Sequence, residues 1–122
     1  MGTWGSGNFE NDTAADFLSE LTDEWIEAIN EAMGSPEGLE PDEYTGVTVP
    51  CLVEILVTIA QKGFTGSQLP TPETAQEWKK TYLEVWDGYI DELEPEEDYK
   101  IKRRECLSET FDSLIRLAKD RE

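Results

Sequence analysis

The apolar run VTVPCLVEILVTIA, residues 47–60, most constrains the fold, because it stands in a chain of net charge −18. Its β-branched residues would allow a buried strand, but its length favours a helix, with Thr48 or Val49 as the cap and Pro50 in the first turn. A helix that is apolar on all sides is expected at the centre of a bundle. We therefore expect the other elements to pack around this run, with Cys51 buried as a small hydrophobic residue.

Glu54 is the only charged residue in this run. A carboxylate in an apolar interior is costly unless it is paired or protonated, so we predict that Glu54 is a buried carboxylate with a compensating partner. Two interpretations remain open. Glu54 forms an ion pair with the helix that carries Lys100–Arg104, or with Arg116, or it is a functional carboxylate with a raised pKa.

Apolar residues recur at every third or fourth position of residues 12–33, which predicts an amphipathic helix. Asp12 or Thr13 is expected to cap its N-terminus. A second capping signal begins at Thr22, so the sequence leaves open whether this helix is continuous or broken near that residue.

Two further helices are predicted in the second half of the chain. The run Thr71-Pro72-Glu73 combines a capping residue, a proline at the first helical position and an acid in the first turn. We expect this helix to run to about Leu93, with its aromatic residues on one broad face, and a last helix to follow Pro95 and end near Lys119. The sequence thus predicts an all-α fold, a single-domain bundle of four to five helices over residues 1–122.

Residues 1–11 predict an ordered arm rich in glycine and tryptophan. Gly2, Gly5 and Gly7 allow a tightly turning backbone. Trp4 and Phe9 would otherwise expose much apolar surface, and burying each contributes roughly 1.5–3 kcal/mol. We therefore expect these two aromatic residues to anchor the arm in a groove between helices.

This opening segment also carries a resemblance. The pattern Met1-Gly2-x-Trp4-Gly5-x-Gly7-x-Phe9-x-Asn11-Asp12-x-Ala14-x-Asp16-Phe17 resembles the opening signature of a bacterial family of small domains of unknown function. The run Asp42-Glu43-Tyr44 and Glu54 resemble the middle region of that family more loosely. The resemblance implies a bacterial, mostly helical, cytoplasmic protein, and it implies no catalytic residues.

The composition excludes several chemistries. The chain has no histidine, which removes Ser-His-Asp and Cys-His catalysis and imidazole zinc sites. Cys51 and Cys106 form no spaced motif and fit a reduced, cytoplasmic protein. No uninterrupted apolar run of membrane-spanning length and no basic leader occurs, so we expect neither a membrane span nor a signal peptide. We expect no cofactor.

The distribution of charge indicates the kind of partner. The first 61 residues contain thirteen acidic residues and no Lys or Arg, so they carry −13 of the total charge. Such a field attracts basic partners and repels nucleic acid and anionic membranes. The basic run KIKRR, residues 100–104, follows an acidic turn, and we expect it to pair with Glu96, Asp98 and acidic neighbours rather than to bind nucleic acid.

These observations favour a protein–protein interaction module, an immunity-protein-like or antitoxin-like neutraliser of a basic protein such as a nuclease toxin. Acidic surfaces capture basic sites by fast, salt-sensitive association. The expected contacts are acids of the first helix and of an acidic connecting loop, residues 34–46. They are Glu20, Asp23, Glu24, Glu27, Glu31, Glu37, Glu40, Asp42 and Glu43.

Two alternatives come from other classes. All-α nucleotide pyrophosphohydrolases hold Mg²⁺ between carboxylate pairs spaced by three residues, and Glu24 with Glu27 and Glu84 with Asp87 have that spacing. A related carboxylate site would use Glu10, Asp12 and Glu54. The second alternative is a structural subunit, monomeric or homodimeric, in which exposed aromatic residues of the helix over residues 72–93 serve a dimer.

Overall fold

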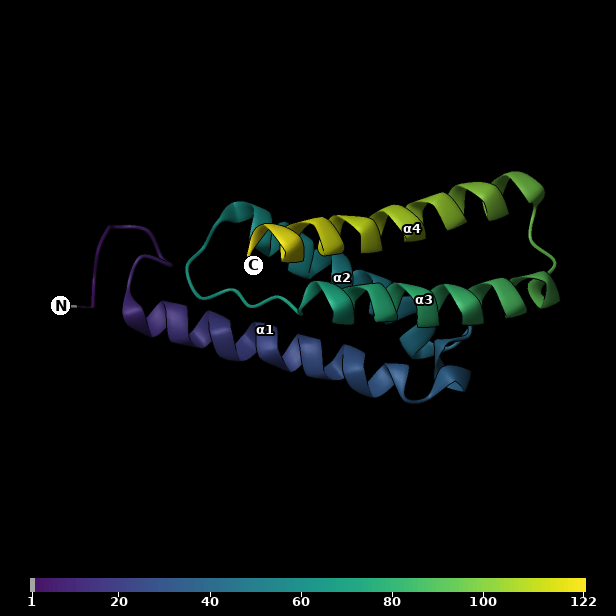
Figure 1. Ribbon diagram of the computed structural model, residues 1–122, viewed down its shortest axis with the longest axis horizontal. Helices are drawn as coiled ribbons and strands as arrows, with labels where there is room; N and C mark the ends of the chain where they lie inside the picture. Colours follow the sequence, from purple (N-terminus) through teal and green to yellow (C-terminus); the bar gives the residue numbers. More distant parts are fainter. Residues whose placement is uncertain (1) are drawn as a thin grey trace.

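The computed structural model describes residues 2–122, and it confirms the predicted all-helical fold with four α-helices (Figure 1). Met1, the first residue of the signature, lies outside the described residues. Figure 1 shows α1 along the lower edge and α4 along the upper edge, with α2 and α3 between them. The elements are α1 (Asp12–Met33), η1 (Pro36–Leu39), α2 (Tyr44–Lys62), α3 (Pro72–Tyr89), η2 (Ile90–Leu93) and α4 (Glu97–Asp120), η1 and η2 being short 3₁₀ helices.

Helix α1 is a single continuous helix. Its cap is Asn11, one residue before the predicted positions, and the Asn11 side chain accepts a hydrogen bond from the Ala14 amide at 2.8 Å. At Thr22 the buried hydroxyl donates to the Leu18 carbonyl at 2.8 Å and accepts from the Gln68 amide at 2.9 Å. The buried hydroxyl therefore has hydrogen-bond partners inside the fold. Thr22 does not start a new helix but links α1 to the loop after α2.

Helix α2 begins at Tyr44, earlier than predicted, so Pro50 lies inside the helix rather than in its first turn. Proline has no N–H, and the carbonyl of Gly46, four residues earlier, therefore lacks its helical donor. The end of η1 also approaches Gly46 closely, because a Cβ there would clash with the Glu40 carbonyl oxygen and lie 2.7 Å from the Leu39 carbonyl oxygen. Leu39 is fully buried, which fixes the connection between α1 and α2 to the core.

The missing donor is supplied by α3. The hydroxyl of Tyr82 donates to the Gly46 carbonyl at 2.5 Å, while the Tyr82 ring is buried and lies 5.5 Å from the Phe111 ring of α4, between centroids. A buried tyrosine hydroxyl requires such a partner. Burial raises the pKa of Tyr82 to about 12, and the charge of Arg103 acts in the opposite direction.

The broad aromatic face of α3 forms the centre of the core. Trp78, Tyr82 and Trp86 are each at most 2 % exposed, so these aromatic residues are not available for a dimer interface as the sequence suggested. The Trp78 indole N–H donates to the Asn30 side chain at 2.8 Å, which joins α3 to α1. The helix is capped by Thr71 as predicted, but it ends at Tyr89, and η2 continues the chain.

The N-terminal segment, residues 2–11, turns back on itself through an isolated bridge between Thr3 and Asn11. The Phe9 ring stacks on the Phe64 ring at 4.5 Å. The side chain of Trp4 is 49 % exposed, so the prediction that Trp4 anchors this segment in a groove is wrong. Trp4 lines a pocket together with Phe9 and Phe64.

The bond between Tyr82 and Gly46 is expected to stabilise the fold only because Pro50 lies in the helix. Tyr82→Phe leaves a buried carbonyl without a donor, and we expect it to lower the free energy of unfolding by about 1–3 kcal/mol. In a Pro50→Ala background the restored amide can donate to Gly46, so the same substitution should cost less. Urea unfolding of the four variants of this cycle measures the difference, and equal costs in both backgrounds would contradict the explanation.

The raised pKa of Tyr82 also predicts a pH dependence. The folded-state pKa of about 12 exceeds the ordinary value of 10.0, so the stabilisation is complete below pH 10.0 and is lost as the pH rises through about 12. Ultraviolet titration of the folded protein should show one tyrosine ionising later than the others. That late step should be absent from Tyr82→Phe.

Candidate partner-binding surface

The outward side of α1 is a stripe of carboxylates. Spacings of three and four residues place these side chains on one side of the helix, and all of them are exposed. No basic residue occurs on α1. The five predicted contact residues of this stripe are Glu20, Asp23, Glu24, Glu27 and Glu31.

A second group of carboxylates lies in η1 and directly after it, and η1 packs against α1. Glu37, Asp42 and Glu43 are exposed and Glu40 is half-buried. One carboxylate oxygen of each of Glu40, Asp42 and Glu43 lies within 4.8 Å of those of the other two. The Tyr89 hydroxyl donates to Asp42 at 3.3 Å, and the charge of Asp42 raises the pKa of Tyr89.

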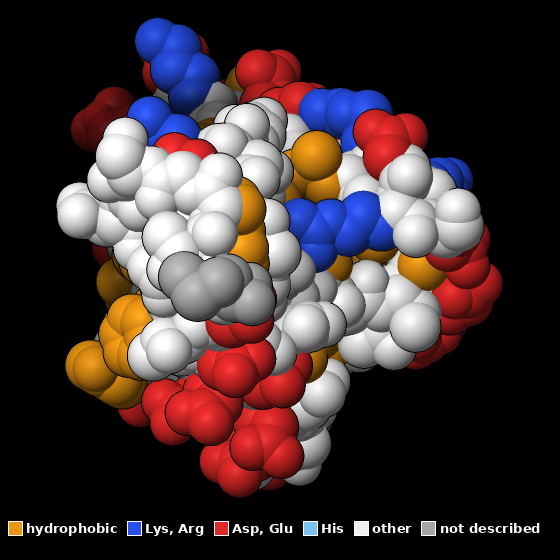
Figure 2. Space-filling view, turned by 90° about the vertical axis from the view of Figure 1, so that its left-hand side faces the viewer, with side chains coloured by type: hydrophobic (Ala, Val, Ile, Leu, Met, Phe, Trp, Pro, Cys, Tyr) orange, Lys and Arg blue, Asp and Glu red, His pale blue; other side chains and the backbone are white. Residues whose placement is uncertain are grey.

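None of these nine carboxylates forms an ion pair with another described residue. The four ion pairs of residues 2–122 all join residues of α3, η2 and α4. Figure 2, which views the molecule from the left-hand end of Figure 1, shows Asp and Glu without Lys or Arg along its lower edge, whereas acidic and basic side chains lie side by side in its upper part. The surface of α1 and residues 37–43, which we call the acidic surface, therefore presents unneutralised negative charge.

Three of the six basic residues of α4 form ion pairs within the fold. Arg104 makes two hydrogen bonds to the Asp87 carboxylate at 2.8 and 2.7 Å, and Lys100 pairs with Asp91 at 2.7 Å. These contacts cross between elements, and they replace the expected pairs with Glu96 and Asp98. Lys100 and Arg104 thus hold α4 against η2 and α3.

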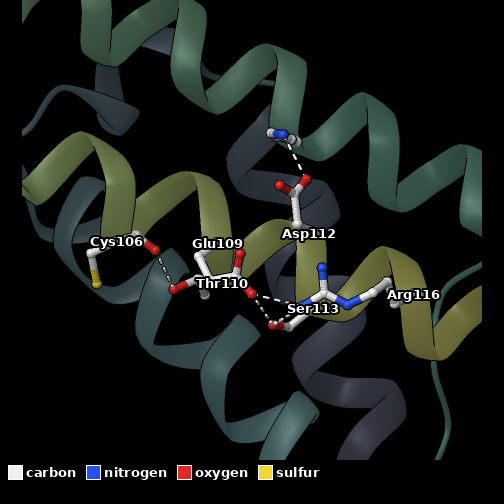
Figure 3. Close-up of polar contacts among 7 residues, drawn as sticks. Cys106, Glu109, Thr110, Asp112, Ser113 and Arg116 are labelled. Carbon is white, nitrogen blue, oxygen red and sulfur yellow. Dashed lines mark hydrogen bonds and ion pairs between the residues drawn. The ribbon is translucent and has the colours of Figure 1, made fainter.

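Further along α4 the same pattern continues (Figure 3). Asp112 points toward α3 and accepts from Lys79 at 2.6 Å. Arg116 binds Glu109 at 2.7 Å and the Ser113 hydroxyl at 3.1 Å along the helix itself. Arg116 is therefore not the partner of Glu54.

Glu54 is exposed, so the prediction of a buried carboxylate is wrong. Cys51 is exposed as well. The missed signal was the spacing of Glu54, Thr58 and Gln61, which lie on one side of α2 and are all exposed. Helix α2 buries its opposite side against the core, and this side faces outward.

The structure does not assemble the predicted metal ligands of a hydrolase. Asp87 is held by Arg104, whose hydrogen bonds lower the pKa of that carboxyl. The pair Glu24 and Glu27 on α1 and the pair Glu84 and Asp87 on α3 do not form a group of three carboxylates within 4.8 Å of one another. Glu10 accepts from the Gly7 amide and does not join Asp12 and Glu54 in a cluster. Among residues 2–122 the carboxylates of Glu40, Asp42 and Glu43 are the group that could offer oxygen ligands to a hard cation.

Helix α2 meets the length and composition criteria for a membrane span, with a mean hydropathy of 1.4 over its most apolar window. A third of that window is buried inside the fold. Core helices of soluble proteins meet the same criteria, so the composition of α2 alone does not identify it as a membrane-spanning helix.

The fold and this surface define a small all-α protein with a large unneutralised acidic surface. The chain belongs to the family DUF4259, a domain of unknown function, whose family model matches residues 2–120. No curated protein and no solved structure matches the chain significantly.

The role of Asp87 as an ion-pair partner can be separated from a role in metal binding. Asp87→Asn should lower the free energy of unfolding by about 0.2–1 kcal/mol, because the pair with Arg104 is partly exposed. The loss should be the same with and without Mg²⁺, as thermal unfolding would show. A Mg²⁺-dependent stabilisation that disappears in this variant would instead support the metal site.

Proposed function

We propose that this protein is an interaction module whose acidic surface binds a basic protein, in the manner of an immunity protein or antitoxin. The observation that carries the proposal is that none of the nine carboxylates of the acidic surface has an ion-pair partner among residues 2–122. A basic partner would supply the missing positive charge.

The arrangement of charges supports this reading. The basic residues that form ion pairs all lie on α3 and α4, where they join the helices or bridge along α4. Like charges at spacings of three and four residues destabilise a helix, so the stripe on α1 opposes folding by repulsion. A bound basic partner relieves that repulsion, and the field of the stripe accelerates the encounter.

The proposal includes the setting suggested by the sequence, the cytoplasm of a bacterium, with a basic protein such as a nuclease toxin as the partner. Electrostatic recognition of this kind excludes nucleic acid as the ligand, since a phosphate backbone is repelled by the same surface. It also requires no catalytic residue or cofactor in this chain.

The test compares two variants of equal net charge in affinity capture from the native lysate. In the first, Glu20, Glu24, Glu27 and Glu31 of the acidic surface become Gln. In the matched control the same change is made at Glu84, Glu92, Glu105 and Glu122, which are exposed and unpaired among the described residues but lie outside the acidic surface.

We expect the wild-type protein and the control to retain a stoichiometric basic protein at low salt and to release it at high salt. The first variant should bind that protein about tenfold more weakly or worse, a change of at least about 1.4 kcal/mol in binding free energy. Equal binding by both variants, or capture of no protein at any salt concentration, would refute the proposal.

A further inference from the structure

A second surface lies on the side of α2 that the sequence led us to expect in the core. Val47 and Ile55 are 52 % and 43 % exposed, and Cys51 lies between them at a spacing of four residues. These three side chains form an apolar stripe along α2. Three of the eight large exposed hydrophobic residues within residues 2–122 belong to α2, and these are Tyr44, Val47 and Ile55.

Helix α4 contributes a parallel stripe. Tyr99, Arg103, Cys106 and Thr110 recur at spacings of four, three and four residues, so they share one side of the helix. The two stripes enclose a groove of about 310 Å³, lined on the α2 side by Pro50, Cys51, Glu54, Ile55, Thr58 and Ile59 and on the α4 side by Arg103, Cys106 and Thr110. Both helices run in the same direction along it (Figure 1).

The groove holds one acid and one base, Glu54 on α2 and Arg103 on α4. Neither forms an ion pair with a described residue, and the Arg103 guanidinium donates only a long hydrogen bond, to the Cys106 sulfur at 4.0 Å, among the described residues. The other two arginines of α4, Arg104 and Arg116, are both paired. The groove therefore combines apolar side chains with one acidic and one basic side chain, neither of which is in an ion pair among the described residues.

We propose that this face, the α2/α4 groove, binds the same face of a second copy of the chain and forms a two-fold symmetric dimer. A two-fold axis that runs along the groove lays α2 of each copy parallel against α4 of the other, because α2 and α4 of one chain run in the same direction and the rotation exchanges the two sides of the groove. The same operation places Glu54 of each copy opposite Arg103 of the other. The face is thus complementary to itself in charge as well as in apolar character.

The distribution of the remaining charge favours a second copy over other occupants. Helix α1 packs on α2, α3 and η1, whereas α4 packs on α2 and α3, so the acidic surface lies away from the α2/α4 groove. Two chains of net charge −18 can meet at this groove with their acidic stripes apart. An anionic membrane would be repelled by that net charge, and a strongly basic partner would meet Arg103 in the groove.

The test uses charge reversal on the full chain, with sedimentation equilibrium as the measurement. Wild type should show a reversible monomer–dimer equilibrium. E54R and R103E should each weaken dimerisation about tenfold or more, because each places two like-charged pairs across the interface. An equimolar mixture of the two variants should restore the dimer, since one chain then carries both positive groups and the other both negative groups.

The mixture distinguishes lost pairing from a folding defect, because a misfolded variant is not rescued by another misfolded variant. As a matched control, E84R makes the same charge change on the exposed side of α3 and should leave the dimer intact. The variant with Gln at positions 20, 24, 27 and 31 should also remain dimeric, which separates this inference from the proposed function. A wild-type protein that stays monomeric at every concentration, or a mixture that stays monomeric, would overturn it.

Discussion

The hydrogen bond from Tyr82 to the Gly46 carbonyl is the contact on which the arrangement of the helices depends. Pro50 removes the donor that a regular helix would supply, so α2 is intact at this point only with α3 packed against it. The absence of a side chain at Gly46 lets η1 approach the same turn, and Leu39 is buried there. The ring of Tyr82 contacts Phe111 of α4. One turn of α2 therefore sets the positions of η1, α3 and α4.

The charges of the chain serve two different purposes in the two halves of the structure. In α3, η2 and α4, basic residues neutralise acids at short distances and hold the helices together. In α1 and residues 37–43 no base is present, and the carboxylates of the acidic surface form no ion pair within the described residues. The apolar contacts of Leu18 and Ile29, which are buried on the opposite side of α1, offset the unfavourable free energy of that repulsion. The packing of α1 thus leaves its charged side free for binding.

Local signals in the sequence predicted much of the backbone. The cap at Thr71 and the single broad aromatic face of α3 follow from short-range rules, because each depends on the spacing of residues within a few turns. The errors fall where the outcome depends on distant residues. Glu54 and Cys51 were assigned to the core from the apolar character of α2 alone, and which side of α2 is covered depends on where α1, α3 and α4 lie.

The sequence by itself determined the helical fold and the accumulation of negative charge in the first half, since periodicity and composition are properties of the chain before it folds. Only the tertiary structure decided that Arg104 binds Asp87, that the acidic surface has no internal partner, and that Glu54 and Arg103 line one groove. These outcomes depend on which helix faces which. Helix packing is selected by the shape and volume of whole side-chain surfaces, and no short stretch of sequence contains that information.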